Sequence, residues 1–582
     1  MTFKQIQNTN SLKFLGPYFK KYSVRITVGL VALLGVDLLQ LLVPRVIKSA
    51  IDGLNSGLFT PHQLINHALS ITGLALGVAV FRFIWRYLIL GFSRLLEQEI
   101  RNKLFEKLLS LDRAYFQKHT TGELMALSSN DLSAVQLACG MGLVSFVDAL
   151  FMTVAVVGFM LYISPLLTLI TLLPLPLLAF LTRHLSGKLH LRFKSVQEQF
   201  SKLTEVARST ISSMRLIKVY TQEENQTKRF DDLGQTYIEH SVKVAKIQGL
   251  LFPISGLIAN FSLLLIILVG AQMVINKTIT VGDFVAFVSY LLMMTWPMMA
   301  IGWVANLFQR GATSLGRIQK VLNDQPLLDD TEASLSLSQP IDLISLSLNS
   351  FSYPGQQSSV LKTISLSYEK GLYGIVGKTG SGKTTLCQLL ARMFPVPDGS
   401  IFINGHDINR YQIGSYRKCI AYVPQDALLF SDTIAFNIAF GVPAATQDQI
   451  ETVARMVGIH DEITSFTNGY ATRIGEKGVK LSGGQRQRIS LARAFMTKAP
   501  VLIIDDSLSA VDSGTEKHIL KSLNRYAEQA IVIVVSNRLS PLRNARSIAV
   551  LNDGLISAVG THQYLIEHSS YYQIIYANQA DN

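Results

Sequence analysis

The sequence is poor in cysteine and in charge. Its three cysteines, Cys139, Cys387 and Cys419, share no close spacing, which excludes a disulfide framework and the usual zinc-ligand patterns. Charged residues make up only 16% of the 582 residues, whereas hydrophobic residues make up 49%. The mean hydropathy is +0.31, too apolar for a soluble protein of this size, so the composition predicts a membrane protein. The first 23 residues are polar, and we expect no cleavable signal peptide.

The net charge of +13 is unevenly distributed along the chain. Residues 1–340 hold 31 Lys and Arg against 21 Asp and Glu, a net charge of +10, and residues 341–582 hold 22 against 19, a net charge of +3. The excess therefore lies in the apolar half, where loops facing the cytoplasm are expected to be basic. We interpret it as a sign of membrane topology and expect no nucleic-acid partner.

Apolar stretches in the first half predict six transmembrane helices, because most of them reach the roughly 20 residues that cross a bilayer. They cover residues 24–46, 67–91, 142–163, 166–182, 248–275 and 282–305. The fourth is short and contains Pro174 and Pro176, so its ends are poorly defined. Basic residues gather in the connections 93–141 and 183–247, which predicts that both termini are cytoplasmic.

The two basic connections have apolar residues at helical spacing. We expect the membrane helices to continue into the cytoplasm and turn there, with residues 120–131 and 213–224 at or near the tips. A polar linker follows at residues 323–340. Beyond it, short β-rich runs alternate with helical runs, which predicts a largely parallel sheet. The expected fold is an α-helical six-span transmembrane domain, residues 1–322, fused to an α/β P-loop nucleotide-binding domain, residues 341–582.

The segment GKTGSGKT, residues 377–384, lies between a predicted strand and a predicted helix. Its glycines let backbone N–H groups converge on phosphates, Lys383 can reach the β- and γ-phosphates, and the Thr384 hydroxyl can bind Mg²⁺. Asp505 ends the apolar run VLIID and is a second candidate Mg²⁺ ligand. The sequence therefore predicts an ATPase core. The residues assigned to its phosphate site are Gly377, Thr379, Gly380, Ser381, Gly382, Lys383, Thr384 and Thr385.

The segment LSGGQRQRISLARA, residues 481–494, makes the chain resemble an ABC exporter half-transporter, in which six membrane helices are fused to one ATP-binding cassette. The resemblance covers nearly the whole chain, and GEKG before this signature is typical of exporters. The other matching motifs are FSYPG at 351–355, GKTGSGKTT at 377–385, VPQD at 423–426, VLIIDD at 501–506, SAVD at 509–512 and VSNRLS at 535–540.

The resemblance implies a role for each matching position, with ATP and Mg²⁺ as cofactors. Tyr353 would stack on adenine, and Gln425 would touch Mg²⁺ and report to the membrane domain. The signature residues would contact the γ-phosphate of ATP held by a partner cassette, and Asp512 would lie at the same interface. The signature residues concerned are Ser482, Gly483, Gly484 and Gln485.

Two positions depart from the family pattern. Asp506 replaces the glutamate that polarises the attacking water, and Asn537 replaces a histidine. Aspartate is one methylene shorter, and a misplacement of ~1 Å can cost on the order of 100-fold in rate. We expect slow or absent hydrolysis at this chain's own P-loop. Because the signature is intact, the hypothesis is a heterodimer with a second ABC half-transporter, resembling the Mdl-type "A" subunit of heterodimeric bacterial multidrug exporters. Neutral substitution in a homodimer is the less favoured alternative.

Ionisable residues within the predicted spans are functional candidates by default. They are Asp37, Arg82, Arg86 and Asp148, for which pairing between helices or a place at a helix end is the ordinary explanation. The segment MMTWPMMAIGW, residues 293–303, offers Met and Trp surfaces suited to varied ligands, although such residues also simply face lipid.

The function expected from these features is ATP-driven export of hydrophobic or amphipathic compounds by a multi-pass protein of the bacterial cytoplasmic (inner) membrane. Its nucleotide-binding domain would be cytoplasmic. A lipid flippase is one alternative, and a regulatory membrane protein that binds nucleotide without pumping is another.

Overall fold

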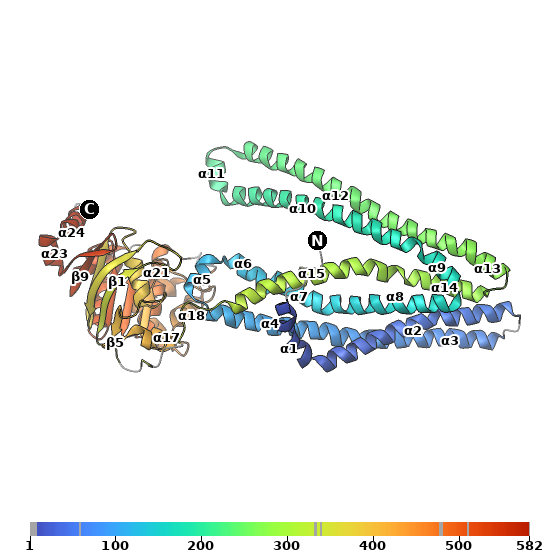
Figure 1. Ribbon diagram of the computed structural model, residues 1–582. Helices are drawn as coiled ribbons and strands as arrows, with labels where there is room; N and C mark the ends of the chain where they lie inside the picture. The colour runs from blue at the N-terminus through green and yellow to red at the C-terminus, as the bar shows by residue number, and fades with distance from the viewer. Residues whose placement is uncertain are drawn as a thin grey trace. The chain divides into compact units, whose positions relative to one another are not determined.

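The computed structural model describes residues 9–57, 60–330, 335–337, 340–475, 481–508 and 511–580. They form two compact units: unit 1 comprises Met1–Leu109 and Gly122–Asp324, and unit 2 comprises Ser110–Thr121 and Gln325–Asn582. Unit 1 is helical and unit 2 is an α/β structure (Figure 1). This confirms the expected fold class.

Unit 1 consists of long helices that continue through short π-helical turns. The first part contains α1 (Thr9–Lys21), α2 (Ser23–Asn55), α3 (Pro61–Trp85), α4 (Gly91–Ser110), α6 (Thr121–Ala126), α7 (Leu132–Leu137) and α8 (Leu143–Ile163). The second part contains α9 (Pro165–Leu172), α10 (Pro174–Ser212), α11 (Met214–Val219), α12 (Glu223–Leu265), α13 (Ala271–Ile275), α14 (Val281–Met293) and α15 (Thr295–Asn323).

Four helical segments of the described residues are long and apolar enough to cross a membrane: Ser23–Asn55, Pro61–Ser110, Thr121–Ile163 and Val281–Asn323. They contain four of the expected spans. The expected spans 166–182 and 248–275 fall on α9–α10 and α12–α13, where several side chains lie outside the described residues. The total of six spans therefore stays a prediction.

The long helices extend beyond their apolar parts, as the sequence predicts, but the first turn comes earlier than expected. It contains the short helix α5 (Arg113–Lys118), whose N-terminus is capped by the carboxylate of Asp112, which accepts the Tyr115 N–H at 3.2 Å. Residues 121–131 already belong to the next long helix. The second turn contains α11, within the expected residues 213–224.

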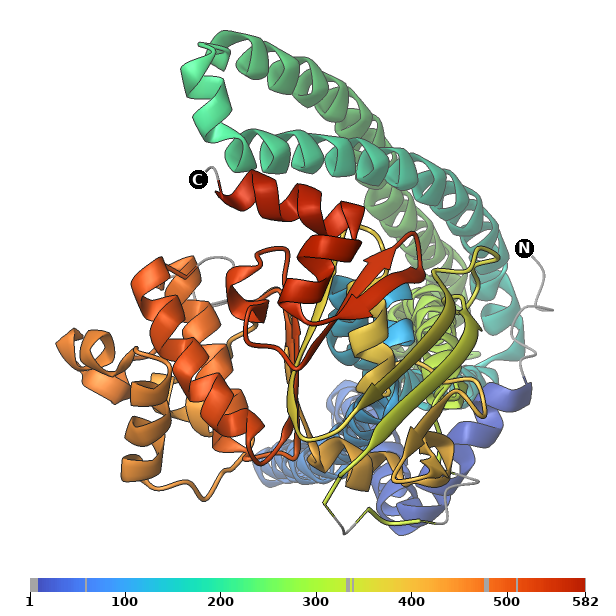
Figure 2. The ribbon, with the colours of Figure 1, turned by 90° about the vertical axis from the view of Figure 1, so that its left-hand side faces the viewer.

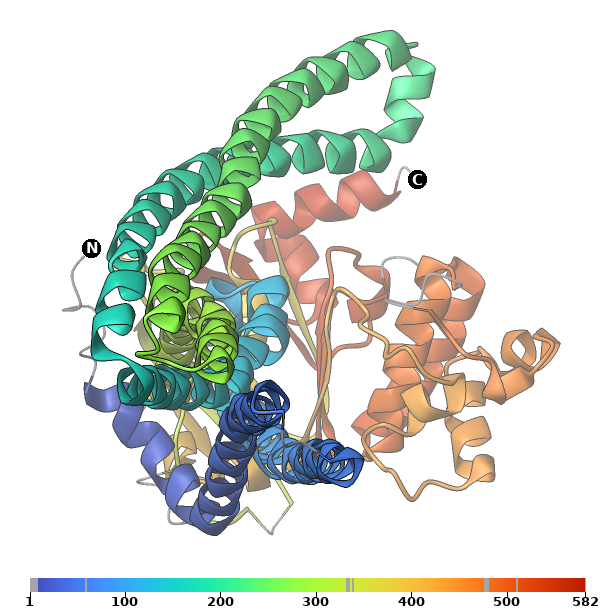
Figure 3. The ribbon, with the colours of Figure 1, turned by 90° about the vertical axis from the view of Figure 1, so that its right-hand side faces the viewer.

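Helix α2 packs against α3, α8 and α14 in unit 1. Tyr290 of α14 is fully buried and donates a hydrogen bond to the Leu41 carbonyl of α2 at 2.9 Å. Helices α10 and α12 pair with each other along their length and extend away from the other helices of unit 1 (Figures 1 and 3).

Unit 2 is built on a mainly parallel six-stranded sheet in the order β10-β9-β3-β8-β7-β6. Its strands are β3 (Gly371–Gly377), β6 (Ile420–Val423), β7 (Val501–Asp505), β8 (Ile531–Val535), β9 (Ser547–Asn552) and β10 (Leu555–Gly560). Every residue of β7 and β8 is buried, as expected for central parallel strands covered on both faces. A second, antiparallel sheet has the order β2-β1-β4-β5, formed by β1 (Ile344–Phe351), β2 (Leu361–Tyr368), β4 (Ile401–Ile403) and β5 (His406–Asp407).

The helices of unit 2 flank these sheets (Figure 2). They are α16 (Lys383–Leu390), α17 (Ile413–Lys418), α18 (Ile434–Ala439), α19 (Gln447–Met456), α20 (His460–Ser465), α21 (Gly483–Met496), α22 (Ser513–Ala527), α23 (His562–His568) and α24 (Ser570–Ala580). Helix α5 also packs here. Ala114 is buried in the same apolar cluster as Tyr416 and Leu390, and the Arg113 guanidinium donates to the Met393 sulfur at 3.5 Å.

The close approach of β3 and β9 predicts that Gly377→Ala destabilises unit 2. A Cβ at Gly377 would lie 2.1 Å from the Leu551 carbonyl oxygen, so the backbone must shift, and we expect a loss of about 1–3 kcal/mol in the free energy of unfolding. Calorimetry of the full-length chain without nucleotide measures it. The control is Gly414→Ala on α17, where a Cβ meets nothing within 4 Å. Equal melting temperatures for the two variants would contradict this account.

Candidate nucleotide-binding site

The predicted phosphate loop connects β3 to α16, in the strand–loop–helix context that the sequence predicts. Gly380 and Gly382 have φ angles of +83° and +102°, in the left-handed region that favours glycine. A Cβ at Gly382 would also lie 2.6 Å from the Leu361 side chain. The loop conformation therefore requires glycine, and it leads directly into the N-terminus of α16, where backbone N–H groups favour an anion.

Lys383, the first residue of α16, is folded back onto this loop. Its ammonium donates to the carbonyl oxygens of Gly377 at 2.7 Å and Lys378 at 2.8 Å. Burial lowers the pKa of Lys383. The Ser381 hydroxyl is buried in the same loop without a hydrogen-bond partner. An ammonium group, an unsatisfied hydroxyl and a glycine-shaped loop fit a polyphosphate, so these residues would hold the ATP phosphates.

The candidate metal ligands lie side by side. The Thr384 hydroxyl donates to Asp505 Oδ1 at 3.1 Å, and the Tyr422 hydroxyl donates to Asp505 Oδ2 at 3.0 Å. Burial raises the pKa of Asp505. A hydroxyl and a carboxylate are the oxygen donors that suit Mg²⁺, so Thr384 and Asp505 fit that ion. Gln425 lies exposed just after β6, the strand that pairs with β7.

Tyr353 lies beside α16, the helix that follows the phosphate loop. Its hydroxyl is 2.8 Å from the Thr385 hydroxyl, and its ring packs edge-on against Phe351 and Phe394 at centroid distances of 5.5 and 5.0 Å. These contacts hold a half-buried aromatic ring next to the phosphate loop. Stacking on adenine remains a prediction.

The two residues that depart from the family pattern contact each other. The Asn537 amide donates to Asp506 Oδ2 at 3.1 Å. Asp506 follows β7 and has a φ of +46°, and its N–H donates to the Val535 carbonyl at 3.0 Å. Burial raises the pKa of Asp506. The carboxylate of Asp506 and the amide of Asn537 therefore direct at least part of their hydrogen-bonding capacity at each other.

A residue that the sequence reasoning missed holds the backbone around Asn537. The side-chain amide of Gln579, on α24, donates to the Asn537 carbonyl at 2.8 Å and accepts the Leu539 N–H at 2.9 Å. Tyr422, which contacts Asp505, was missed as well. Neither residue belongs to a recognised motif, and their spacing from Asn537 and Asp505 along the chain carries no signal of contact.

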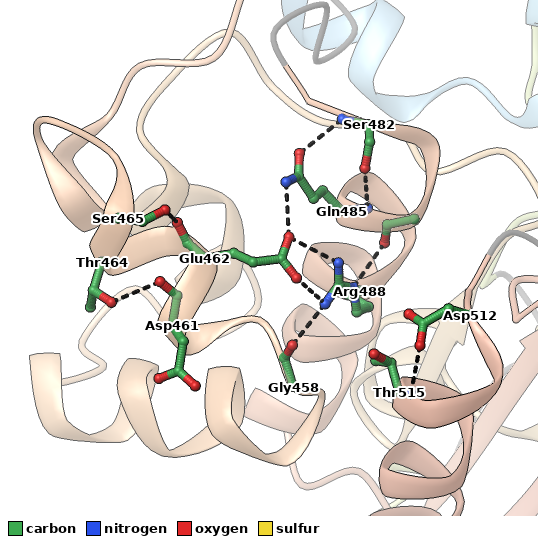
Figure 4. Close-up of polar contacts among 11 residues, drawn as sticks. Gly458, Asp461, Glu462, Thr464, Ser465, Ser482, Gln485, Arg488, Asp512 and Thr515 are labelled. Atoms are coloured by element: carbon green, nitrogen blue, oxygen red, sulfur yellow. Dashed lines mark hydrogen bonds and ion pairs between the residues drawn. The ribbon is translucent and has the colours of Figure 1, made fainter.

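The signature segment opens α21 (Figure 4). Ser482 caps the helix: its hydroxyl accepts the Gln485 N–H at 3.2 Å, while the Gln485 side chain accepts the Ser482 N–H at 2.9 Å. Gly483 and Gly484 form the first turn behind this cap. Asp512 caps α22 nearby by accepting the Thr515 N–H at 3.0 Å, and hydrogen bonds from this backbone lower its pKa. Residues 476–480, which include most of GEKG, and Ser509 and Ala510 lie outside the described residues.

Glu462, on α20, joins the signature helix to its neighbour (Figure 4). It accepts hydrogen bonds from Gln485 at 2.9 Å and from the two terminal guanidinium nitrogens of Arg488, at 2.6 and 3.0 Å. Burial alone would raise the pKa of Glu462, but the hydrogen bonds and the charge of Arg488 lower it overall. Glu462 therefore orients Gln485, which in turn fixes Ser482. The sequence motifs gave no indication of this role.

Comparisons with known proteins agree with this arrangement. Residues 26–298 match the ABC transporter transmembrane region, and residues 361–509 match the ABC transporter cassette family. The chain is 37% identical over 98% of its length to a probable multidrug resistance ABC transporter ATP-binding/permease protein, YheI, of Bacillus subtilis, covering 97% of that protein. It is 36% identical over 97% of its length to the multidrug resistance-like ATP-binding protein MdlA of Escherichia coli, covering 95% of it.

The fold is also similar to a solved structure of a bacterial Atm1-family ABC exporter with ATP bound. The two share 25% identity with a TM-score of 0.78, and the match covers 96% of this chain and 98% of that one.

The contacts of Glu462 predict that Glu462→Gln loosens the signature helix. Arg488 is only 7% exposed and would lose its charged partner, so we expect a loss of about 1–2 kcal/mol in the free energy of unfolding and faster amide hydrogen exchange at residues 482–488. The control is Glu451→Gln, which breaks an exposed pair with Arg455 at 3.2 Å and should change little. Unchanged exchange at 482–488 in Glu462→Gln would exclude the orienting role.

Proposed function

Because this chain belongs to the ABC transporter family, we propose that it is one half of an exporter that uses ATP to move hydrophobic or amphipathic compounds out of a bacterial cell. The main support is that relatives described as multidrug resistance transporters match it over 97–98% of its length, including both units. The apolar helices of unit 1 would form the pathway through the cytoplasmic (inner) membrane. The basic connections 93–141 and 183–247 support cytoplasmic termini and a cytoplasmic unit 2.

The cassette would bind ATP and Mg²⁺ through the residues described above. Lys383 and the loop amides would hold the phosphates, Thr384, Asp505 and Gln425 would hold the metal, and Tyr353 would carry the adenine. Ser482, Gly483 and Gly484 would complete the ATP site of a second cassette.

Hydrolysis at this chain's own phosphate loop would be slow. Asp506 has a shorter side chain than glutamate, and its Oδ2 already accepts the Asn537 amide at 3.1 Å. Neither residue would then be placed to orient water at the terminal phosphate. Catalysis of phosphoryl transfer depends on such positioning. The capped signature helix supports a heterodimer in which a partner carrying glutamate and histidine performs the turnover.

Transport by the two-subunit complex tests the exporter function. In proteoliposomes containing this chain and its co-purified partner, ATP should drive accumulation of an amphipathic fluorescent dye inside inside-out vesicles. Lys383→Ala in this chain should reduce the rate, because the phosphates lose their cation. Movement of labelled phospholipid without dye would indicate a flippase, and nucleotide binding without movement of either would indicate a regulatory protein.

Asymmetric hydrolysis is tested separately. The lone chain should bind ATP but hydrolyse it about 100-fold more slowly than the complex, as expected for misplaced catalytic groups. The double substitution Asp506→Glu with Asn537→His should raise the rate of the lone chain, whereas Asp506→Asn should hardly change it. Rapid turnover by the unmodified lone chain that Asp506→Asn abolishes would refute the asymmetric heterodimer.

A further inference from the structure

A cavity of about 670 Å³ lies between α2 and α3 of unit 1. The two helices run antiparallel and pack against each other (Figures 1 and 3). Both belong to segments that are long and apolar enough to cross a membrane. The volume of the cavity is within the range of cavities that bind organic molecules. None of the residues assigned to the nucleotide site lines it.

The lining of the cavity changes from polar to apolar along the two helices. Its polar residues lie at the ends of the expected spans 24–46 and 67–91 and are Arg45, Ser49, His67 and Ser70. Its apolar residues include, deeper in the same spans, Leu39, Leu42 and Leu74. A bilayer changes in the same direction, from polar headgroups to acyl chains. The polar end of the cavity is therefore expected at the depth of the headgroups.

The chain offers Arg45 no carboxylate within its described part, where the ion pairs do not include this residue. Asp52, further along α2, accepts the Thr280 hydroxyl of α14 at 2.8 Å instead. Asp283, on α14, pairs with Lys48 at 2.6 Å. An arginine at the edge of an apolar span is stabilised by an anion, so Arg45 is a candidate for binding one.

Two aromatic rings hold the Arg45 guanidinium beside the cavity. It lies over Phe159 and Tyr162 of α8, at 5.6 and 5.7 Å from the ring centroids. Phe159 stacks in turn on Tyr290 at 5.5 Å, and Tyr290 donates to the Leu41 carbonyl at 2.9 Å. Stacking occupies the face of a guanidinium and leaves the N–H groups at its edge for oxygen acceptors.

A phospholipid suits both ends of the cavity. A guanidinium binds phosphate through paired N–H···O hydrogen bonds. Ser49 lies four residues after Arg45, on the same face of α2, so its hydroxyl can donate to the same phosphate. A free phosphate would leave the apolar end empty, and an uncharged lipid would leave Arg45 without an anion. Basic cavities between membrane helices recognise lipid headgroups by this chemistry.

We propose that the cavity between α2 and α3 binds an anionic phospholipid of the surrounding membrane. Arg45 and Ser49 hold the phosphate, and an acyl chain lies along the apolar end. The end of α2 that carries Arg45 faces the outer leaflet if the termini are cytoplasmic, as in the proposed exporter. Binding requires no nucleotide, because every residue of the site belongs to unit 1.

Native mass spectrometry of the full-length chain in detergent micelles tests the polar end. The probes are dioleoylphosphatidylglycerol and dioleoylglycerol, which has the same acyl chains without the phosphate. Arg45→Gln should weaken binding of the phospholipid by about tenfold or more and leave binding of dioleoylglycerol unchanged. Arg45→Lys should have an intermediate effect, because an ammonium cannot form the paired hydrogen bonds. The control is Lys277→Gln, at an exposed cation in the turn before α14.

The substitution Gly73→Leu tests the apolar end. Gly73 lines the cavity on α3, and a Cβ there meets nothing within 4 Å, so the new side chain would enter the cavity without displacing the backbone. Leucine favours a helix more than glycine does, so this variant should fold. It should weaken binding of both lipids by about tenfold. The control is Gly187→Leu on α10, where a Cβ also meets nothing within 4 Å.

Three results would overturn the lipid site. One is an equal loss of phospholipid binding in Arg45→Gln and Lys277→Gln, which would indicate unspecific attraction to charge. Another is binding of glycerol 3-phosphate as tight as that of the phospholipid, which would make the ligand a soluble phosphate. The third is loss of phospholipid binding when the partner subunit is present, which would mean that a partner helix fills the cavity.

The proposed export function is measured independently of this site. Dye transport by the complex that persists when no phospholipid binds would leave the exporter intact and remove the lipid site. Phospholipid binding that depends on Arg45, in a complex that transports neither dye nor lipid, would leave the lipid site intact and refute the exporter.

Discussion

The parallel pairing of β3, β7 and β8 is the constraint on which the candidate ATP site depends. Because the carboxyl ends of parallel strands meet at one edge of a sheet, the phosphate loop follows β3, Asp505 ends β7 with Asp506 next to it, and Asn537 follows β8. The Thr384–Asp505 and Asn537–Asp506 hydrogen bonds are consequences of this register. One register therefore places the candidate phosphate and metal ligands beside Asp506 and Asn537, the two residues that depart from the family pattern.

The signature helix is held by a different kind of contact. Its cap is local, formed by Ser482 and Gln485, but the orientation of Gln485 comes from Glu462 on the preceding helix α20. The same carboxylate neutralises Arg488, so one ion pair both offsets a buried charge and fixes the cap. The proposed asymmetric dimer would need this combination of an intact signature and an altered Asp506–Asn537 pair, because each cassette would lend its signature to the other.

The sequence predicted those parts of the site that depend on local pattern. The loop at 377–384, the strand ending at Asp505 and the helix after Ser482 are each encoded by neighbouring residues. Glu462 and Gln579 could not be predicted, because tertiary packing brings them from 23 and 42 residues away to Gln485 and Asn537. The first turn between the long helices was placed too late because Asp112 caps a short helix ahead of the polar segment that resembled a turn. Hydrophobic periodicity predicts where helices lie. It does not give the number of membrane spans in a region such as α9 and α10, which follow each other almost without a break.

The two units treat buried charge differently. In unit 2, Lys383 is satisfied by loop carbonyls, Asp505 by Thr384 and Tyr422, and Arg488 by Glu462. In unit 1, Asp131 is similarly paired with Arg317 and Ser314. Asp37, on α2, is buried as well, but its Oδ2 has no hydrogen-bond partner. An unsatisfied buried carboxyl oxygen destabilises the packing around it, so the apolar contacts of α2 with α3, α8 and α14 have to offset that cost.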